Sequence, residues 1–217
     1  MCGIFGVAGK GSLAEQDLYC LVEHAQQRGK DSSGLMRHDG QHYRVDRADF
    51  GVMRLWRQQG RPCGPLIFGH SRLVTNGQAD NQPVMRDEVC VFHNGIIVNA
   101  EAVWPVLSEP RHLQIDTEVI AALTVQHLKE GQPLDELPAR VLAACVGVMA
   151  CALVLPRLGK IQCAIFFTGR IQIIYNNPGR KLFETGSCTV EVIPFGLYMH
   201  FFYKHIKSCC NCKQHNA

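Results

Sequence analysis

The stretch Cys2-Gly3-Ile4-Phe5-Gly6-Val7-Ala8 is the part of the sequence on which the fold depends most. Its small and apolar residues predict a buried strand, which Gly9 and Gly11 end. If Met1 is removed, Cys2 carries a thiol and a free α-amine. An α-amine with a pKa of about 7.7–8.0 can take the thiol proton at neutral pH. The alternative interpretation is that Cys2 only begins a buried strand, because free cysteine is among the most buried residue types.

Five polar strings follow this strand along the chain. Two of them end apolar runs, Leu66 to Arg72 and Val89 to His93, that read as further strands. Polar residues at strand ends are placed to line a site. The strings are Gln27-Arg28-Gly29-Lys30-Asp31-Ser32-Ser33-Gly34, Gly69-His70-Ser71-Arg72-Leu73-Val74-Thr75-Asn76-Gly77, Asn81-Gln82-Pro83, His93-Asn94-Gly95-Ile96-Ile97-Val98-Asn99 and Asp116-Thr117-Glu118.

With the Cys2 strand, these strings resemble the glutaminase domain of the class II glutamine amidotransferases, a branch of the N-terminal nucleophile hydrolases. The resemblance runs from Cys2 to about Gly147. The His-Asn-Gly-Ile-Ile and Asp-Thr-Glu-Val-Ile strings are most like the hexosamine-phosphate synthase group. The Asn-Gln-Pro string is nearer the asparagine synthetase and phosphoribosyl-amine synthase branches. The resemblance implies hydrolysis of glutamine to glutamate and ammonia through a Cys2 thioester, no cofactor, and an acceptor-substrate synthase domain or subunit that takes the ammonia.

The order of the predicted helices and strands also supports this family. A helix is predicted after the capping-box pair Ser12 and Glu15, with one apolar face formed by Leu18, Leu21, Val22 and Ala25. Two more are predicted, one from Asp116 with Val119, Ile120, Leu123, His127 and Leu128 at helical spacing, and one over Leu134 to Cys145. Strands first, helices in the middle and strands again fit two stacked antiparallel sheets with helices outside. The family fold is an α+β, four-layer α/β/β/α sandwich. The other predicted strands are a hairpin over Leu35 to Arg47 turned at Asp39-Gly40, and Val146 to Leu155, Ile161 to Phe167 and Ile171 to Tyr175.

Hydrolysis of a side-chain amide by acyl transfer needs a nucleophile, a base, donors for the oxyanion and a recognition pocket. Cys2 can supply the first two. Asn94 and Gly95 offer an amide side chain and a backbone N–H as oxyanion donors, and the matching pair in the family has this role. The alternative is a hairpin turn at Asn94-Gly95, since Asn-Gly is the strongest hairpin dipeptide. A tight turn can itself aim an N–H, so the two interpretations are compatible.

Free glutamine carries a carboxylate and an ammonium, so its pocket needs one fixed cation and one fixed anion. Arg72 suits the carboxylate and Asp116 suits the ammonium. The resemblance places the same roles on these residues, and we expect Thr75 and Gly95 to add contacts to the amino-acid end of the substrate. Taken alone, Arg72 is more typical of a surface or salt-bridging arginine, and Asp116 of a helix N-cap. By resemblance Arg28 helps to hold the N-terminal residue, and Asn99 closes the site region.

Composition excludes several classes of protein. The net charge of +3 is spread along 217 residues, which gives no electrostatic support for a nucleic-acid or membrane partner. No run approaches the ~18 apolar residues of a spanning helix, and the start lacks the order of a signal peptide, so we expect a cytoplasmic protein. Eleven scattered cysteines do not form a secreted disulfide framework.

We expect one domain over residues 1–217, well matched to the family over 1–150 and divergent over 151–217, with a loosely ordered tail at 205–217. The tail carries a set of soft ligands that is too crowded for the usual tetrahedral zinc site, so we expect no metal. These ligands are His205, Cys209, Cys210, Cys212 and His215.

Three functions remain open from the sequence. The first is a glutaminase marked by Cys2, Arg72, Asn94, Gly95 and Asp116 together. The second is a non-catalytic interaction or regulatory module that keeps the fold. The third is an amidase for a different amide. A retained initiator methionine would favour the second, because it blocks the α-amine and removes the base.

Overall fold

The structure, a computed structural model, describes residues 2–8, 15–38, 42–64, 66–74, 80–155, 160–166, 171–175, 189–194 and 199–203. From residue 160 onward it describes the backbone of the strands. Within these ranges no helix has the length and apolar character needed to span a membrane.

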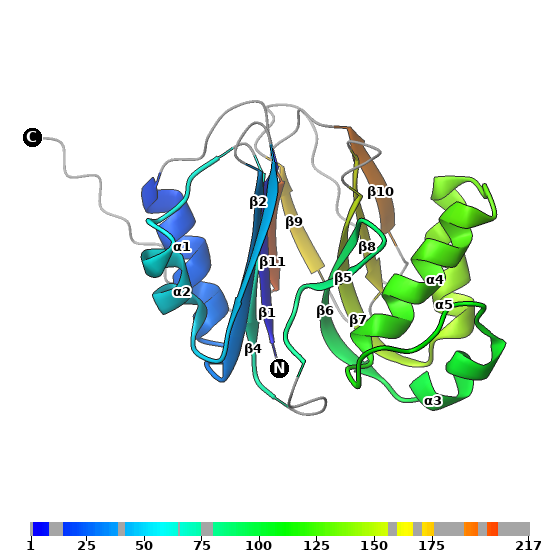
Figure 1. The fold of residues 1–217 in the computed structure, drawn as a ribbon. Helices are drawn as coiled ribbons and strands as arrows, with labels where there is room; N and C mark the ends of the chain where they lie inside the picture. The colour runs from blue at the N-terminus through cyan, green and yellow to red at the C-terminus, as the bar shows by residue number, and fades with distance from the viewer. Residues whose placement is uncertain are drawn as a thin grey trace, which may run out of the picture.

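The first sheet contains the strand that follows Cys2. Its strands lie in the order β1 (Gly3–Ala8), β4 (Leu66–Arg72), β2 (Ser32–His38) and β3 (Tyr43–Ala48), and every pair is antiparallel. Helices α1 (Glu15–Gln26) and α2 (Val52–Gln58) cover its outer face (Figure 1). Helix α1 buries the apolar face that the sequence predicts, formed by Leu18, Leu21, Val22 and Ala25.

The second sheet is ordered β10 (Thr189–Pro194), β8 (Lys160–Phe166), β7 (Gly147–Leu155), β6 (Val89–Ile97) and β5 (Val84–Arg86). Helices α4 (Thr117–Lys129) and α5 (Leu137–Ala144) cover its outer face (Figure 1). A short helix, α3 (Ala100–Val103), follows β6, and 3-10 turns span Trp104–Val106 and Leu134–Glu136. Strands β9 (Ile171–Tyr175) and β11 (Met199–Tyr203) pair with each other, and β11 lies beside β1.

The inner faces of the two sheets pack against each other. Phe68 of β4 and Phe92 of β6 meet with their ring centroids 5.9 Å apart, inside a buried apolar cluster that draws on both sheets. Each outer face has its own core beneath the helices. The result is helix, sheet, sheet, helix (Figure 1), so the predicted pair of antiparallel sheets with helices outside is confirmed.

Strand β6 and helix α2 differ from the sequence predictions. Strand β6 continues beyond His93 to Ile97, so Asn94-Gly95 lies inside a strand and the hairpin interpretation is wrong. Both residues pair with β7, Asn94 opposite Ala150, and this distant pairing overrides the local turn preference of Asn-Gly. Helix α2 was not predicted, because seven residues are too few to establish a helical period and its N-cap, Gly51, offers no capping side chain.

Candidate active site

Cys2 lies at the end of the first sheet, where three separate segments contact it. The antiparallel register pairs Gly3 with Ser71, which brings Cys2 beside the end of β4. Its backbone N–H donates to Asn94 Oδ1 at 3.1 Å, and its carbonyl accepts from Arg28 Nε at 2.8 Å. Its Sγ lies 3.6 Å from the Leu73 carbonyl oxygen. The main chain of Cys2 is therefore held from both sides, and its side chain is partly buried.

The thiol of Cys2 is protonated at neutral pH. Burial raises its pKa above the ordinary value, and the Leu73 backbone and the positive charges of Arg72 and Arg28 oppose this rise. A nucleophile with a raised pKa needs a base within hydrogen-bond reach. The backbone nitrogen of the same residue is held in position by the Asn94 contact, and it can act as a base only as a free α-amine, once Met1 is removed.

Asn94 and Gly95 lie within β6, and the Asn94 side chain contacts this nitrogen. Because Asn94 Oδ1 accepts from Cys2, the Nδ2 amide lies on the other branch of the side chain and is free to donate elsewhere. Gly95 has φ +150°, and a Cβ there would come within 1.8 Å of the Val148 carbonyl oxygen. Only glycine fits at this position.

Arg72 is the last residue of β4 and is only 2% exposed. Its guanidinium donates to the Asp80 carbonyl, so its direction is fixed. Burial lowers the pKa of Arg72, and the nearby Cys2 and Asp116 oppose the shift. An arginine remains charged in such surroundings. The interpretation of Arg72 as a surface arginine is therefore wrong, because it is a buried cation beside Cys2.

Asp116 occupies the N-cap position of α4 but makes no capping hydrogen bond with its side chain. Its carboxylate instead faces β6, where Oδ2 accepts the Ile97 N–H at 2.8 Å. Asp116 Oδ1 lies 3.8 Å from His93 Nδ1. The side chain is 9% exposed and lies beside the strand that carries Asn94.

His93 is a site residue to which the sequence pattern assigns no role. Its ring is fully enclosed, with Nδ1 3.2 Å from Thr117 Oγ1. Burial lowers its pKa, against the opposing charge of Asp116, so the imidazole is neutral at neutral pH. The signal for it was its place directly before Asn94, and nothing in the local pattern separated it from an ordinary buried histidine.

The remaining predicted residues lie at different distances from the thiol. Asn99 closes the end of β6: its Nδ2 donates to the Ala144 carbonyl at 2.9 Å, and its Oδ1 accepts the Val146 N–H at 2.7 Å. These bonds tie the end of β6 to the short segment between α5 and β7. Thr75 lies outside the described residues. The structure thus brings together Cys2, Arg28, Arg72, Asn94, Gly95 and Asp116.

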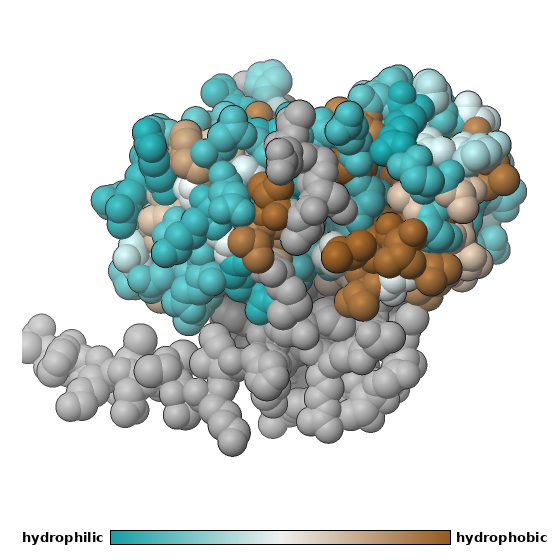
Figure 2. All heavy atoms as spheres, turned by 90° about the horizontal axis from the view of Figure 1, so that it is seen from below, coloured by the Kyte–Doolittle hydropathy of each residue, from teal (hydrophilic) through white to brown (hydrophobic). Residues whose placement is uncertain are grey.

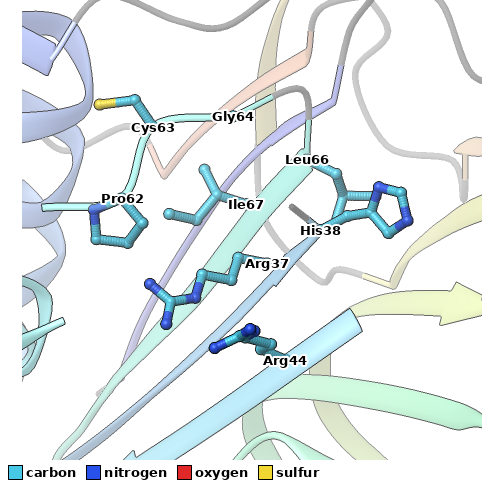
Figure 3. Close-up of a pocket in the computed structure, with 8 residues that line it drawn as sticks. All are labelled: Arg37, His38, Arg44, Pro62, Cys63, Gly64, Leu66 and Ile67. Carbon is cyan, nitrogen blue, oxygen red and sulfur yellow. The ribbon is translucent and has the colours of Figure 1, made fainter. Parts of the chain in front are cut away.

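A small cavity of about 150 Å³ lies at the opposite end of the first sheet (Figure 3). Strand β2 ends there and β4 begins there, so the cavity is a full strand length from Cys2. The cavity is lined by Arg37, His38, Arg44, Pro62, Cys63, Gly64, Leu66 and Ile67.

No group of His, Cys, Asp or Glu side chains suited to a metal ion occurs among the described residues.

Curated relatives match most of the chain. Glutamine–fructose-6-phosphate aminotransferase (isomerizing) from Bartonella henselae is 30% identical over 204 residues, covering 90% of this chain and 33% of that protein. The Bradyrhizobium diazoefficiens enzyme of the same name is 34% identical over 149 residues, covering 64% and 24%. The chain therefore spans between a quarter and a third of the length of these relatives. No family model matches it.

Solved structures share the fold. Glutamine phosphoribosylpyrophosphate amidotransferase from B. subtilis superposes with a TM-score of 0.64 at 23% identity, covering 82% of this chain and 40% of that one. A structure described as the allosteric regulatory enzyme of purine biosynthesis gives a TM-score of 0.61 at 24% identity, covering 80% and 39%.

Proposed function

The chain contains a class II glutamine amidotransferase domain, and from that premise we propose that it hydrolyses glutamine to glutamate and ammonia with Cys2 as nucleophile. The observation that carries the proposal is the 3.1 Å contact between the Cys2 nitrogen and Asn94 Oδ1. It sets the nucleophile, its base and an oxyanion donor side by side. With Met1 removed, this nitrogen is the α-amine.

The first half of the reaction forms a thioester. The α-amine takes the thiol proton, and the thiolate attacks the side-chain carbonyl carbon of glutamine. The carbonyl oxygen becomes an oxyanion that accepts from Asn94 Nδ2 and the Gly95 N–H. The protonated amine then returns its proton to the leaving nitrogen, the C–N bond breaks, and ammonia departs.

The second half regenerates the thiol. The free α-amine takes a proton from water, and the hydroxide attacks the thioester carbon through the same oxyanion site. The C–S bond breaks, the amine returns its proton to the sulfur, and glutamate leaves. No group outside the chain and its substrate is consumed except one water.

Recognition of free glutamine falls to the two buried charges. Arg72 takes the α-carboxylate and Asp116 takes the α-ammonium. Support comes from the fixed direction of the Arg72 guanidinium and from the Asp116 carboxylate, which is turned away from its helix. Thr75 contributes to the amino-acid end, and Arg28 and Asn99 have supporting roles on Cys2 and on the end of β6.

The ammonia passes to an acceptor-substrate synthase domain or subunit. Support comes from the greater length of the relatives and from apolar surface beside the site. Four aliphatic side chains are exposed at the facing ends of β6 and β7 or one residue beyond them, and Val98 is 70% exposed. Figure 2 shows hydrophobic side chains gathered on the face seen from below. The four are Ile96, Val98, Val146 and Val148.

Glutamate release from glutamine, with and without candidate acceptors, tests the function. Wild-type protein should release glutamate, and Cys2→Ala should release none while keeping its fold by circular dichroism. Intact mass should show that Met1 is absent. Equal turnover by wild type and Cys2→Ala would rule out the mechanism. A retained Met1 in an inactive protein would favour the non-catalytic alternative.

A further inference from the structure

Gln82 makes a two-pronged contact with the main chain of His93. Its Nε2 donates to the His93 carbonyl at 2.8 Å, and its Oε1 accepts the His93 N–H at 2.6 Å. Strand β5 pairs Val84 with Val91, so the same antiparallel register puts residue 82 opposite His93. The Gln82 side chain therefore takes the place that a main-chain partner would have in the ladder.

The segment that carries Gln82 is fastened to the first sheet. Asn81 Nδ2 donates to Asp49 Oδ1 at 2.6 Å, and Arg47 Nε donates to the Pro83 carbonyl at 2.8 Å. The Gln82 carbonyl oxygen lies against β2, where a Cβ on Gly34 would come within 1.9 Å of it. Gln82 thus reaches from the first sheet to a strand of the second.

His70 of β4 makes a second contact from the first sheet. Its Nε2 lies 3.1 Å from the same His93 carbonyl oxygen. A carbonyl can only accept, so this nitrogen carries the proton of the neutral ring. Burial lowers the pKa of His70 to about 3, which keeps the ring neutral. The His93 carbonyl therefore has two donors, one from Gln82 and one from His70.

That carbonyl belongs to the peptide group linking His93 to Asn94, whose side chain contacts the Cys2 nitrogen. We propose that Gln82 and His70 are positioning residues that hold this peptide group and thereby aim the Asn94 amide at the Cys2 nitrogen and the oxyanion. The proposal rests on the proposed function, and it assigns to Gln82 an effect on catalysis without contact with the substrate.

Gln82→Met tests it, because methionine has nearly the same shape but neither donates nor accepts in this way. A small misplacement of a reacting group costs up to about 100-fold in rate. We expect kcat to fall about 10- to 100-fold while KM changes little. Thr124→Val is the matched control: Thr124 is also buried and bonded to a main-chain carbonyl, that of Ile120, but it lies on α4. Its kcat should equal that of wild type. Equal losses in both variants would overturn the proposal.

Gln82→Glu provides a rescue with a pH signature. A protonated glutamic acid both donates and accepts as glutamine does, whereas the carboxylate cannot donate to the His93 carbonyl. Burial beside neutral His70 and His93 raises the pKa of the new carboxyl, and the negative charge of Asp49 adds to this rise, while the positive charge of Arg47 opposes it. The activity of Gln82→Glu relative to wild type should therefore fall as pH rises. An activity ratio of Gln82→Glu to wild type that does not change with pH would contradict the positioning role of Gln82.

Alkylation of Cys2 by iodoacetamide separates this proposal from the proposed function, because it needs no glutamine. The Cys2 rate, followed by peptide mass, should differ from wild type in Gln82→Met and match wild type in Thr124→Val. Unchanged Cys2 rates in Gln82→Met would overturn the positioning role even if glutamine is hydrolysed. Altered rates in a protein that never hydrolyses glutamine would support the positioning role and reject the function.

Discussion

At the scale of single residues, the surroundings of Cys2, and not the extent of its exposure, distinguish it among the cysteines that the structure describes. Cys63 is exposed, yet its only sulfur contact within the described residues is the Arg61 carbonyl, and burial together with Glu15 raises its pKa. Cys2 instead lies beside Arg28, Arg72 and Asn94. Exposure alone would identify Cys63 as the reactive cysteine, whereas the surrounding charges and hydrogen bonds identify Cys2.

A glutamine analogue with a diazo ketone in place of the amide should therefore attach covalently, one molecule per chain, to Cys2 and to no other cysteine of the eleven. The analogue must bind in the amino-acid pocket to reach a thiol, and Cys63 has no such pocket beside it. Peptide mass mapping locates the label, and Cys2→Ser should take up none. Iodoacetamide should label Cys63 in the same sample, which would show that the Cys63 thiol is accessible. Analogue found on Cys63 would count against the assignment.

Arg72 and Asp116 should act on binding more than on chemistry. Each contacts an end of glutamine whose charge does not change during acyl transfer, so the contact is equally strong in ground and transition states. A charge-assisted hydrogen bond contributes about 1.5–3 kcal/mol, so Arg72→Ala or Asp116→Asn should raise KM roughly 10- to 150-fold. Asn94→Ala should instead lower kcat with little change in KM. Unaltered KM in the first two variants would place the pocket elsewhere.

At the scale of elements, β6 determines the site because one strand carries both structural and reactive positions. Val91 and Ile97 are buried in the core under α4. Asn94 and Gly95 lie between these two residues along the strand. The Asn94 side chain contacts the Cys2 nitrogen, and Gly95 lies against the Val148 backbone of β7. The strand is held along its length by β7 and at its end by Asn99. Any shift in its register would move the oxyanion donors away from the thiol.

Gly95→Ala should test that dependence. Its φ of +150° is unfavourable for alanine, and its Cβ would overlap the Val148 carbonyl. Strained backbone costs about 1–2 kcal/mol and overpacking about 1–3 kcal/mol, so unfolding free energy should fall by roughly 2–5 kcal/mol. Gly131→Ala is the control, since Gly131 has φ +66° with open space around it and should lose only the backbone part. Urea denaturation compares the two, and equal losses would show that the β7 contact is not tight.

At the scale of the whole molecule, a buried ion network places the loop that leads to Asp116. Arg86 of β5 contacts Glu118 at 2.9 Å and Glu109 at 3.2 Å, and it also donates to the Pro110 carbonyl. Glu118 accepts the Leu113 N–H at 2.7 Å. Strand β5, helix α4 and the intervening loop are thus joined by one guanidinium.

Arg86→Met should therefore destabilise the protein strongly, because it leaves the Glu118 carboxylate buried without its cation. Breaking such a pair costs about 3–5 kcal/mol. Glu101→Gln breaks the exposed pair with Arg111, at 2.7 Å, and should cost at most about 1 kcal/mol. Chemical denaturation at neutral pH measures both. A loss below 1 kcal/mol in Arg86→Met would mean that the network does not hold the loop.

The sequence by itself determined the features that depend on neighbours along the chain. Apolar spacing predicted the buried faces of α1 and α4 and the strand after Cys2, because helical and strand periods are local properties. The order of the polar strings also indicated the family and the candidate residues. These signals required no knowledge of which strands pair.

Tertiary structure alone decided what depends on distant segments. Cys2 and Asn94 are 92 residues apart, and only the packing of the two sheets brings them to 3.1 Å. Pairing with β7 made Asn94-Gly95 part of a strand where the dipeptide favoured a turn. The contact from Gln82 to His93 likewise follows from the β5 register and from the first sheet lying against the second. The physical reason is that hydrogen bonds between sheets are set by register and burial, and no local pattern of residues encodes either.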